Sequence, residues 1–259
     1  MQYLHGSTNE EGTNEHTAAN EEAVSDFYFA GSHDPVLELL CEFLKYNSNP
    51  VLISTAFKGS MEGLIALYHR DSEIAGVHLW DDKSEEYNLP FIKHLLPGEH
   101  LTVVNLVQRV QGWIVPVGNP FQLESWDDIT KKEIRFINRQ KGSGTRLRLD
   151  QYLLEHEISS GQIKGYENEE NTHMGVALKI ANGEANAGLG VQAAAHKMGL
   201  DFVPLFTERY DLVVLQENAI KPQWSQVLSM INSPAFIRAI NQQIGYDSSL
   251  TGKIMYQTY

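Results

Sequence analysis

The chain has 259 residues, of which 42% are hydrophobic and 20% charged. Such a chain can bury a substantial core, which excludes a disordered polymer and a small disulfide scaffold. Its 20 basic and 33 acidic residues give a net charge of −13, which argues against a broad nucleic-acid-binding face, because such a face needs many Lys and Arg side chains. The negative charge does not exclude a small anion as ligand.

The single cysteine, Cys41, cannot form an intramolecular disulfide, so a reducing compartment is allowed. The first residues lack a basic start followed by an apolar run, and no later stretch reaches the roughly 18 apolar residues of a membrane span. We therefore expect a cytoplasmic protein without membrane insertion. A chain from which a signal peptide had been removed would look the same, so a periplasmic location is the alternative.

The beginning of the chain is acidic. Six acidic residues precede Phe27 without a single Lys or Arg among them: Glu10, Glu11, Glu15, Glu21, Glu22 and Asp26. Asn, Thr, Glu and Gly dominate this segment and nothing in it repeats at helical spacing, so residues 1–24 are predicted to form a flexible acidic tail. One hypothesis for its role is recruitment of a partner protein.

From Ser25 onward, short apolar runs alternate with helical stretches, which is the pattern of an α/β sheet. The predicted strands are 26–30, 51–56, 74–79, 101–107, 113–117, 134–138, 185–190, 202–206 and 211–215. The first predicted helix is the clearest, because its apolar residues fall on one face that should pack on the sheet: Val36, Leu39, Leu40, Phe43 and Leu44. Helical sequence returns at 225–231 and 234–244, and turns are expected at 97–98 and 118–120.

A glycine–serine step follows a predicted strand three times, at 31–32, 59–60 and 142–143. Each step places a hydroxyl residue at an expected helix start, where free backbone N–H groups and the helix dipole attract anions. Lys58 and Arg146 lie beside two of these steps and would add positive charge. A serine there usually only caps its helix, but three such steps at the carboxyl edge of a sheet favour a ligand site.

A fourth expected helix start is Thr172-His173, where Thr172 could cap the helix and His173 should be neutral. A surface histidine is the alternative interpretation. The stretch 188–193 also fits the dinucleotide pattern G-x-G-x-x-A, with Glu208 twenty residues beyond its first glycine, but no repeated βαβ unit surrounds it. No paired-cysteine or H-E-x-x-H motif is present, so we expect neither a metal nor a cofactor.

Taken together, these segments resemble a known family. The resemblance is carried, in order, by Gly31-Ser32-His33-Asp34, Lys58-Gly59-Ser60, Ala75-Gly76-Val77-His78, Arg109-Val110-Gln111-Gly112, Asn138-Arg139-Gln140, Gly142-Ser143-Gly144-Thr145-Arg146, Thr172-His173 and Leu200-Asp201-Phe202-Val203-Pro204. The chain is similar to the type-2 periplasmic-binding-protein-like family, which is related to the molybdate and tungstate receptors of ABC importers. This implies an α/β fold of two lobes, each a mixed sheet flanked by helices, that closes on a ligand. Lobe 1 would comprise 25–107 plus 209–259, and lobe 2 would comprise 108–208.

The resemblance also implies a function without catalysis, namely binding or sensing of a small oxyanion. Molybdate and tungstate are the first candidates for this ligand. The ligand contacts carried over or considered by position are Ser32, His33, Lys58, Gly59, Ser60, Ser143, Gly144, Thr145, Arg146, Thr172 and His173. A transporter or regulator subunit is the expected partner. Direct nucleic-acid binding is not expected, because residues 1–27 are too short and too acidic for a DNA-binding module. The alternative is a binding protein or enzyme for a larger organic anion, held by Arg109, Arg139 or Arg146.

Overall fold

The computed structural model describes residues 26–258, so the predicted acidic tail, residues 1–24, lies outside the described residues. The strands are β1 (Asp26–Gly31), β2 (Leu52–Phe57), β3 (Ile74–Val77), β4 (Trp80–Asp81), β5 (Glu86–Tyr87), β6 (Leu101–Val115), β7 (Phe136–Arg139), β8 (Glu169–Glu170), β9 (Ala187–Val191), β10 (Asp201–Leu215), β11 (Tyr246–Asp247) and β12 (Ile254–Gln257). The helices are α1 (Pro35–Lys45), α2 (Ser60–His69), α3 (Leu89–Leu95), α4 (Gly144–Glu155), α5 (His173–Ala181), α6 (Gln192–Lys197), α7 (Gln216–Ala219), α8 (Pro222–Ile231) and α9 (Pro234–Asn241). Single 3₁₀ turns lie at Asp127–Thr130 and Ser160–Gln162.

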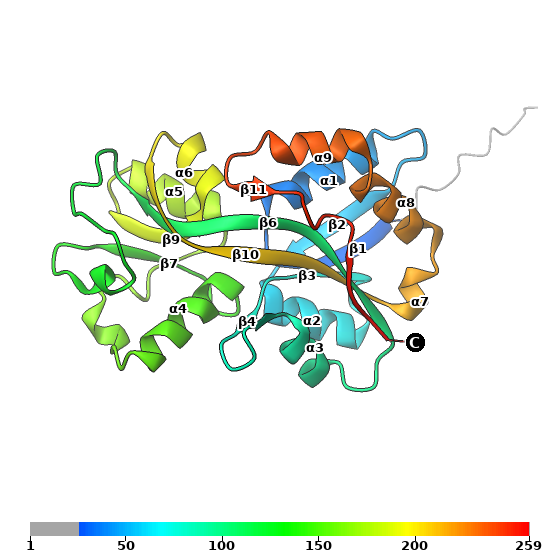
Figure 1. Ribbon diagram of the computed structural model, residues 1–259, viewed down its shortest axis with the longest axis horizontal. Helices are drawn as coiled ribbons and strands as arrows, with labels where there is room; N and C mark the ends of the chain where they lie inside the picture. Colours follow the sequence, from blue (N-terminus) through cyan, green and yellow to red (C-terminus); the bar gives the residue numbers. More distant parts are fainter. Residues whose placement is uncertain (1–25, 259) are drawn as a thin grey trace, which may run out of the picture.

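Most strands belong to one mixed sheet with the order β2-β1-β3-β10-β6-β9-β7-β8. Strands β1, β2 and β3 run parallel to one another, as do β7, β8 and β9. The antiparallel strands β6 and β10 lie between these two groups and pair with each other along almost their whole length. The sheet therefore has two parallel halves joined by two long crossing strands (Figure 1).

Helices cover both faces of each half. Figure 1 shows α1, α8 and α9 on one face of the first half and α2 and α3 on the other, while α5 and α6 lie opposite α4 in the second half. Four separate clusters of buried apolar side chains correspond to these four layers. The mixed α/β fold of two lobes predicted from the sequence is confirmed, whereas the predicted lobe boundaries stay a prediction.

Helix α1 shows how the sequence produces these layers. Its apolar residues recur at helical spacing, and Val36, Leu40 and Leu44 are completely buried against the sheet. The helix begins with a proline at its first position and is capped by Asp34, whose side chain accepts a hydrogen bond of 2.7 Å from the backbone N–H of Val36. The cap is thus Asp34, and the predicted hydroxyl cap at Ser32 is wrong, because the helix starts three residues later.

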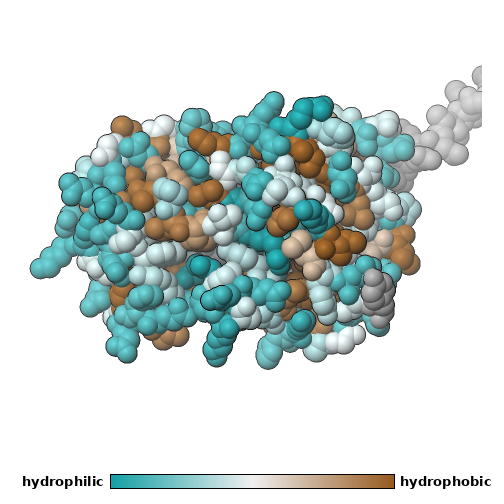
Figure 2. Space-filling view, viewed as in Figure 1, coloured by the Kyte–Doolittle hydropathy of each residue, from teal (hydrophilic) through white to brown (hydrophobic). Residues whose placement is uncertain are grey.

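The two crossing strands differ from the prediction. The expected strands 101–107 and 113–117 form one continuous strand, β6, and 202–206 and 211–215 likewise form β10. Between the expected strands, Arg109, Gln111 and Glu208 have buried side chains that form a polar network, and the backbone there stays in the strand ladder. Hydrophilic residues also gather on the surface in the middle of the view, where the two halves meet (Figure 2).

Candidate functional site

Three polar residues of the first half converge where its parallel strands end. Ser32 follows β1, Ser60 begins α2 and His78 follows β3, and all three are buried. The hydroxyl oxygens of Ser32 and Ser60 are 2.9 Å apart, and Ser60 Oγ accepts a hydrogen bond of 3.2 Å from the backbone N–H of His78. The predicted pair Ser32 and Ser60 therefore lies together, beside a histidine that was not predicted as a ligand contact.

The second half contributes the starts of two helices. Ser143 caps α4, its Oγ accepting a hydrogen bond of 3.2 Å from the backbone N–H of Arg146, and Thr172 caps α5 through the N–H of Gly175 at 2.9 Å. The predicted capping role of Thr172 is confirmed. His173, the first residue of α5, is completely buried, so the surface interpretation of this histidine is wrong.

The two halves touch beside these residues. Gly59, with φ of +105°, packs so closely that a Cβ atom there would lie 2.9 Å from the backbone oxygen of Gly142. A Cβ atom on Gly144 would lie 2.4 Å from the backbone oxygen of His78. The N-terminal ends of α2 and α4 thus face each other across the contact. We call the residues gathered here the inter-lobe site: Ser32, Ser60, His78, Gln111, Arg139, Ser143, Gly144, Thr145 and His173.

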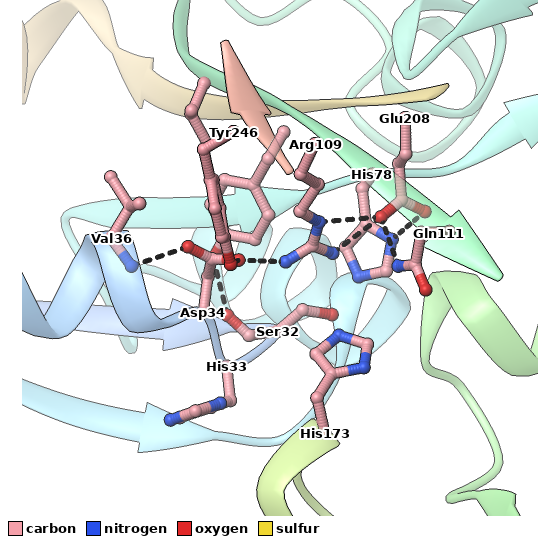
Figure 3. Close-up of polar contacts among 12 residues, drawn as sticks. Ser32, His33, Asp34, Val36, His78, Arg109, Gln111, His173, Glu208 and Tyr246 are labelled. Carbon is pink, nitrogen blue, oxygen red and sulfur yellow. Dashed lines mark hydrogen bonds and ion pairs between the residues drawn. The ribbon is translucent and has the colours of Figure 1, made fainter. Parts of the chain in front are cut away.

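A buried charge network supports the site from the crossing strands. Arg109 of β6 and Glu208 of β10 lie opposite each other in the ladder and form an ion pair, with Nη2 2.7 Å from Oε2. Arg109 also pairs with Asp34, the cap of α1, and Asp34 accepts a further hydrogen bond of 3.0 Å from the hydroxyl of Tyr246 (Figure 3). One guanidinium therefore faces two carboxylates, and its charge is fully compensated.

The network extends into the inter-lobe site through Glu208. His78 Nδ1 lies 2.7 Å from Glu208 Oε1, and the Gln111 amide nitrogen donates to Glu208 Oε2 at 2.6 Å and to Thr145 Oγ1 at 3.3 Å (Figure 3). Burial alone would raise the pKa of Glu208, but the neighbouring His78 and Arg109 lower it to about 2. Burial also lowers the pKa of His78, against the attraction of the Glu208 carboxylate. The pair at neutral pH is thus a neutral imidazole and an ionised carboxylate.

Arg139, at the end of β7, differs from Arg109 in its partners. Both guanidiniums are only 1% exposed, but Arg139 has no carboxylate within ion-pair distance among residues 26–258. It donates to His173 Nε2 at 2.9 Å, to the backbone oxygens of Asn171 at 3.0 Å and Glu170 at 3.2 Å, and to Gln140 Oε1 at 3.3 Å. Burial and the nearby Arg109 lower its pKa to about 9, so at neutral pH it remains a charged group without a counterion.

Three residues that were predicted to contact the ligand are not among the residues of the inter-lobe site. Lys58 is exposed, and His33 is buried with its Nε2 2.9 Å from Glu38 of α1. Arg146 is buried within the second half, where it pairs with Asp150 at 2.9 Å and Glu169 at 3.0 Å. Both of these ion pairs lie inside the second half, so Arg146 does not join the two halves through them.

Gln111 and Glu208 were not predicted as residues of the site, and Arg109 was considered only for a larger organic anion. Arg109 and Gln111 occupy alternate positions of β6 and so share one face of the strand, opposite Glu208 on β10. Two polar residues at this spacing inside an apolar run are a sequence signal, but the prediction of a strand break concealed it. Glu208 was considered only with the dinucleotide pattern, whose glycines Gly188 and Gly190 lie within β9 and not in a loop before a helix.

Residues 26–258 contain no helix long and apolar enough to cross a membrane. The same part of the chain contains no group of three or more His, Cys, Asp or Glu side chains that could hold a metal ion. The lone cysteine, Cys41, is half-buried in α1, and burial raises the pKa of its thiol to about 11, so it is not activated as a nucleophile.

Comparison with known proteins gives related sequences and folds. A family model described as "PBP superfamily domain" matches residues 42–232. An uncharacterized protein of Bacillus subtilis, YvgK, is 37% identical over 202 residues, which cover 78% of this chain and 65% of that protein. The chain thus spans about two thirds of the length of this relative.

Solved structures share the fold at low sequence identity. A putative phosphate ABC transporter substrate-binding protein from Clostridium perfringens, with bound phosphate, superposes with a TM-score of 0.60 at 15% identity, covering 85% of this chain and 98% of that one. A tungstate ABC transporter structure from Geobacter sulfurreducens gives 0.58 at 14% identity, covering 83% and 97%. This comparison contradicts the expected cytoplasmic location. The structural neighbours belong to ABC transport systems, which points to a location outside the cytoplasm.

Proposed function

Because this chain belongs to the PBP superfamily, as its resemblance indicated, we propose that it binds a small oxyanion at the inter-lobe site and catalyses no reaction. The observation that carries the proposal is Arg139, a buried guanidinium in contact with neutral acceptors alone. A buried cation without a counterion is destabilising unless a ligand supplies the negative charge. The site is therefore built to receive an anion.

The neutral groups around Arg139 suit the same ligand. Ser32 and Ser60 supply hydroxyl groups from the first half, and Ser143 and Thr145 supply hydroxyl groups at the start of α4. The N-termini of α2, α4 and α5 add free backbone N–H groups and the positive ends of their dipoles. These donors come from both halves, so an anion between them would hold the halves together.

The size of the ligand follows from the contacts beside the site. The halves approach so closely at Gly59 and Gly144 that one added methyl group would collide with the opposite half. Of the three arginines considered for a larger organic anion, Arg109 and Arg146 are each paired with two carboxylates, which leaves Arg139 alone. A small tetrahedral oxyanion therefore fits better than a large organic anion.

The surroundings of His78 do not suit catalysis. This residue and Glu208 resemble the base and its orienting acid in a hydrolase, which would need a nucleophile at the free ring nitrogen. Nε2 of His78 is buried without a hydrogen-bond partner among the described residues, so no serine hydroxyl is poised there.

By analogy with its structural neighbours, the protein would deliver its ligand to an ABC transporter.

Isothermal titration calorimetry with phosphate, sulfate, molybdate and tungstate tests this function. We expect at least one of the four to bind with one-to-one stoichiometry, and the sequence-based preference is for molybdate or tungstate. Arg139→Met should abolish the heat of binding while urea unfolding shows a folded protein. Lack of binding to all four anions by folded wild-type protein would contradict the proposal, as would unchanged binding in Arg139→Met.

A further inference from the structure

The hydrogen-bond partners of the two histidines fix which ring nitrogen carries the proton. His78 Nδ1 lies 2.7 Å from the Glu208 carboxylate, which is ionised and can only accept. Nδ1 therefore carries the proton, and Nε2 of the neutral ring is left as an acceptor. In His173 the two ring nitrogens have the opposite roles. Nε2 accepts a hydrogen bond of 2.9 Å from the Arg139 guanidinium, so Nδ1 carries the proton and is the donor.

The orientation of the Gln111 amide is fixed by the same carboxylate. Its nitrogen donates to Glu208 Oε2 at 2.6 Å, so its oxygen Oε1 is the free end of the group. Both this oxygen and Nε2 of His78 are buried without a partner among the described residues. The site thus contains two oriented acceptors next to its many donors.

These acceptors lie at the place where the anion is proposed to bind. The backbone N–H of His78 donates a hydrogen bond to the Ser60 hydroxyl, and the His78 ring packs against the start of α4 at Gly144. Figure 3 shows the rings of His78 and His173 on either side of Ser32, with Gln111 beside His78. The charged groups around His78 are Glu208, Arg109 and Arg139, and Tyr210 stacks on its ring.

We propose that the ligand is a protonated oxyanion of the hydrogen phosphate or hydrogen arsenate type, whose hydroxyl group donates a hydrogen bond to Nε2 of His78. Oxyanions without a proton present lone pairs on every oxygen, so one of them would face the lone pair of His78 across the site. An acceptor buried against another acceptor loses its hydration and gains nothing. Gln111 Oε1 offers the second acceptor for a doubly protonated ion.

This inference rests on the proposed function and sharpens it, because it selects among small oxyanions. Phosphate and arsenate keep at least one proton throughout the pH range in which proteins fold, whereas sulfate, molybdate and tungstate carry none at neutral pH. A site that hydrogen-bonds a ligand hydroxyl rejects analogues lacking it by a large factor. The structure therefore departs from the sequence-based preference for molybdate or tungstate.

Competitive calorimetry at pH 7 with phosphate, arsenate, sulfate, molybdate and tungstate tests the selection on the unaltered protein. Phosphate and arsenate should bind at least about 100-fold more tightly than the other three. Equal or tighter binding of sulfate, molybdate or tungstate would overturn the inference and leave oxyanion binding itself intact. Binding of none of the five would instead overturn the proposed function together with this inference.

Two substitutions of His78 test whether this residue is responsible for the discrimination between phosphate and sulfate. In His78→Asn the side-chain amide can still donate to Glu208 from the position of Nδ1, but nothing replaces Nε2 as an acceptor. Phosphate binding should weaken by about 10- to 100-fold while sulfate binding does not weaken, so the discrimination collapses. In His78→Gln the amide reaches the position of Nε2 and can present its oxygen, so the discrimination should be retained in part.

Urea unfolding shows whether each variant is folded. The selectivity measured on the wild-type protein does not depend on either variant. Discrimination in a folded His78→Asn protein equal to that of the wild type would overturn the role of His78. Loss of phosphate and sulfate binding by the same factor would do so as well, because that result indicates a merely structural role.

Discussion

Substitutions of Arg109 and Arg139 can be compared to test whether each buried charge stabilises the fold or is kept for a ligand. Both guanidiniums are 1% exposed, but Arg109 faces the carboxylates of Asp34 and Glu208, whereas Arg139 faces neutral acceptors. The perturbation is the same in both cases, substitution by Met, which keeps most of the side-chain volume. The two variants should differ sharply in the free energy of unfolding measured without added anions.

The magnitudes follow from the partners. Arg109→Met leaves two carboxylates buried without a cation, and such losses cost about 3–5 kcal/mol. For Arg139, a pKa lowered to about 9 corresponds to a penalty on the order of 5 kcal/mol for holding the charged form, present at every pH below that value. Its removal is offset by the loss of four hydrogen bonds, to His173, Asn171, Glu170 and Gln140, at about 1–2 kcal/mol each. Arg139→Met should therefore destabilise the protein by only about 1 kcal/mol.

Urea unfolding followed by circular dichroism measures the difference. With a slope of about 2–3 kcal/mol per M, the midpoint of Arg109→Met should fall about 1 M below that of Arg139→Met. Equal destabilisation of the two variants would refute the reasoning, because it would show that Arg139 stabilises the fold and is not held for a ligand.

The remaining predictions concern pH, closure and capping. The pKa of Glu208 is lowered in the folded state, so its contribution is complete above pH ~4.5 and is lost as pH falls toward 2; Glu208→Gln should flatten the acid limb of a stability–pH profile. Gly59→Ala should weaken anion binding at least about 10-fold in calorimetry, because its methyl group meets the opposite half, whereas Gly118→Ala, also at positive φ but in open space, should leave affinity unchanged. Thr172→Ala should lower the unfolding free energy by about 1 kcal/mol through loss of the α5 cap, and an unchanged urea midpoint would contradict this.

The sequence predicted the local features of the fold well. Apolar runs and helical spacing located β1, β2 and α1 because these elements bury apolar residues in a regular pattern. The glycine–serine steps indicated Ser60 and Ser143 as residues at helix starts, and both lie in the inter-lobe site. Features of this kind depend on neighbours in sequence and are therefore visible in one chain.

The long-range features could not be predicted in the same way. The polar residues of β6 looked like an interruption of the strand, because their partners Asp34 and Glu208 are 75 and 99 residues away from Arg109. The different roles of the three arginines also depend on folded partners, since Arg146 is paired within one half and Arg139 is not paired with any carboxylate. Composition and spacing do not distinguish a compensated arginine from an uncompensated one.

The central claim is that an anion completes the charge balance at Arg139, and one comparison tests it most directly. Urea unfolding of the wild-type protein and of Arg139→Met is measured at pH 7 with and without phosphate. Because bound phosphate supplies the counterion that the buried guanidinium lacks, phosphate should raise the unfolding midpoint of the wild-type protein and leave that of Arg139→Met unchanged. A wild-type midpoint that phosphate does not raise, or an equal rise in Arg139→Met, would contradict the claim.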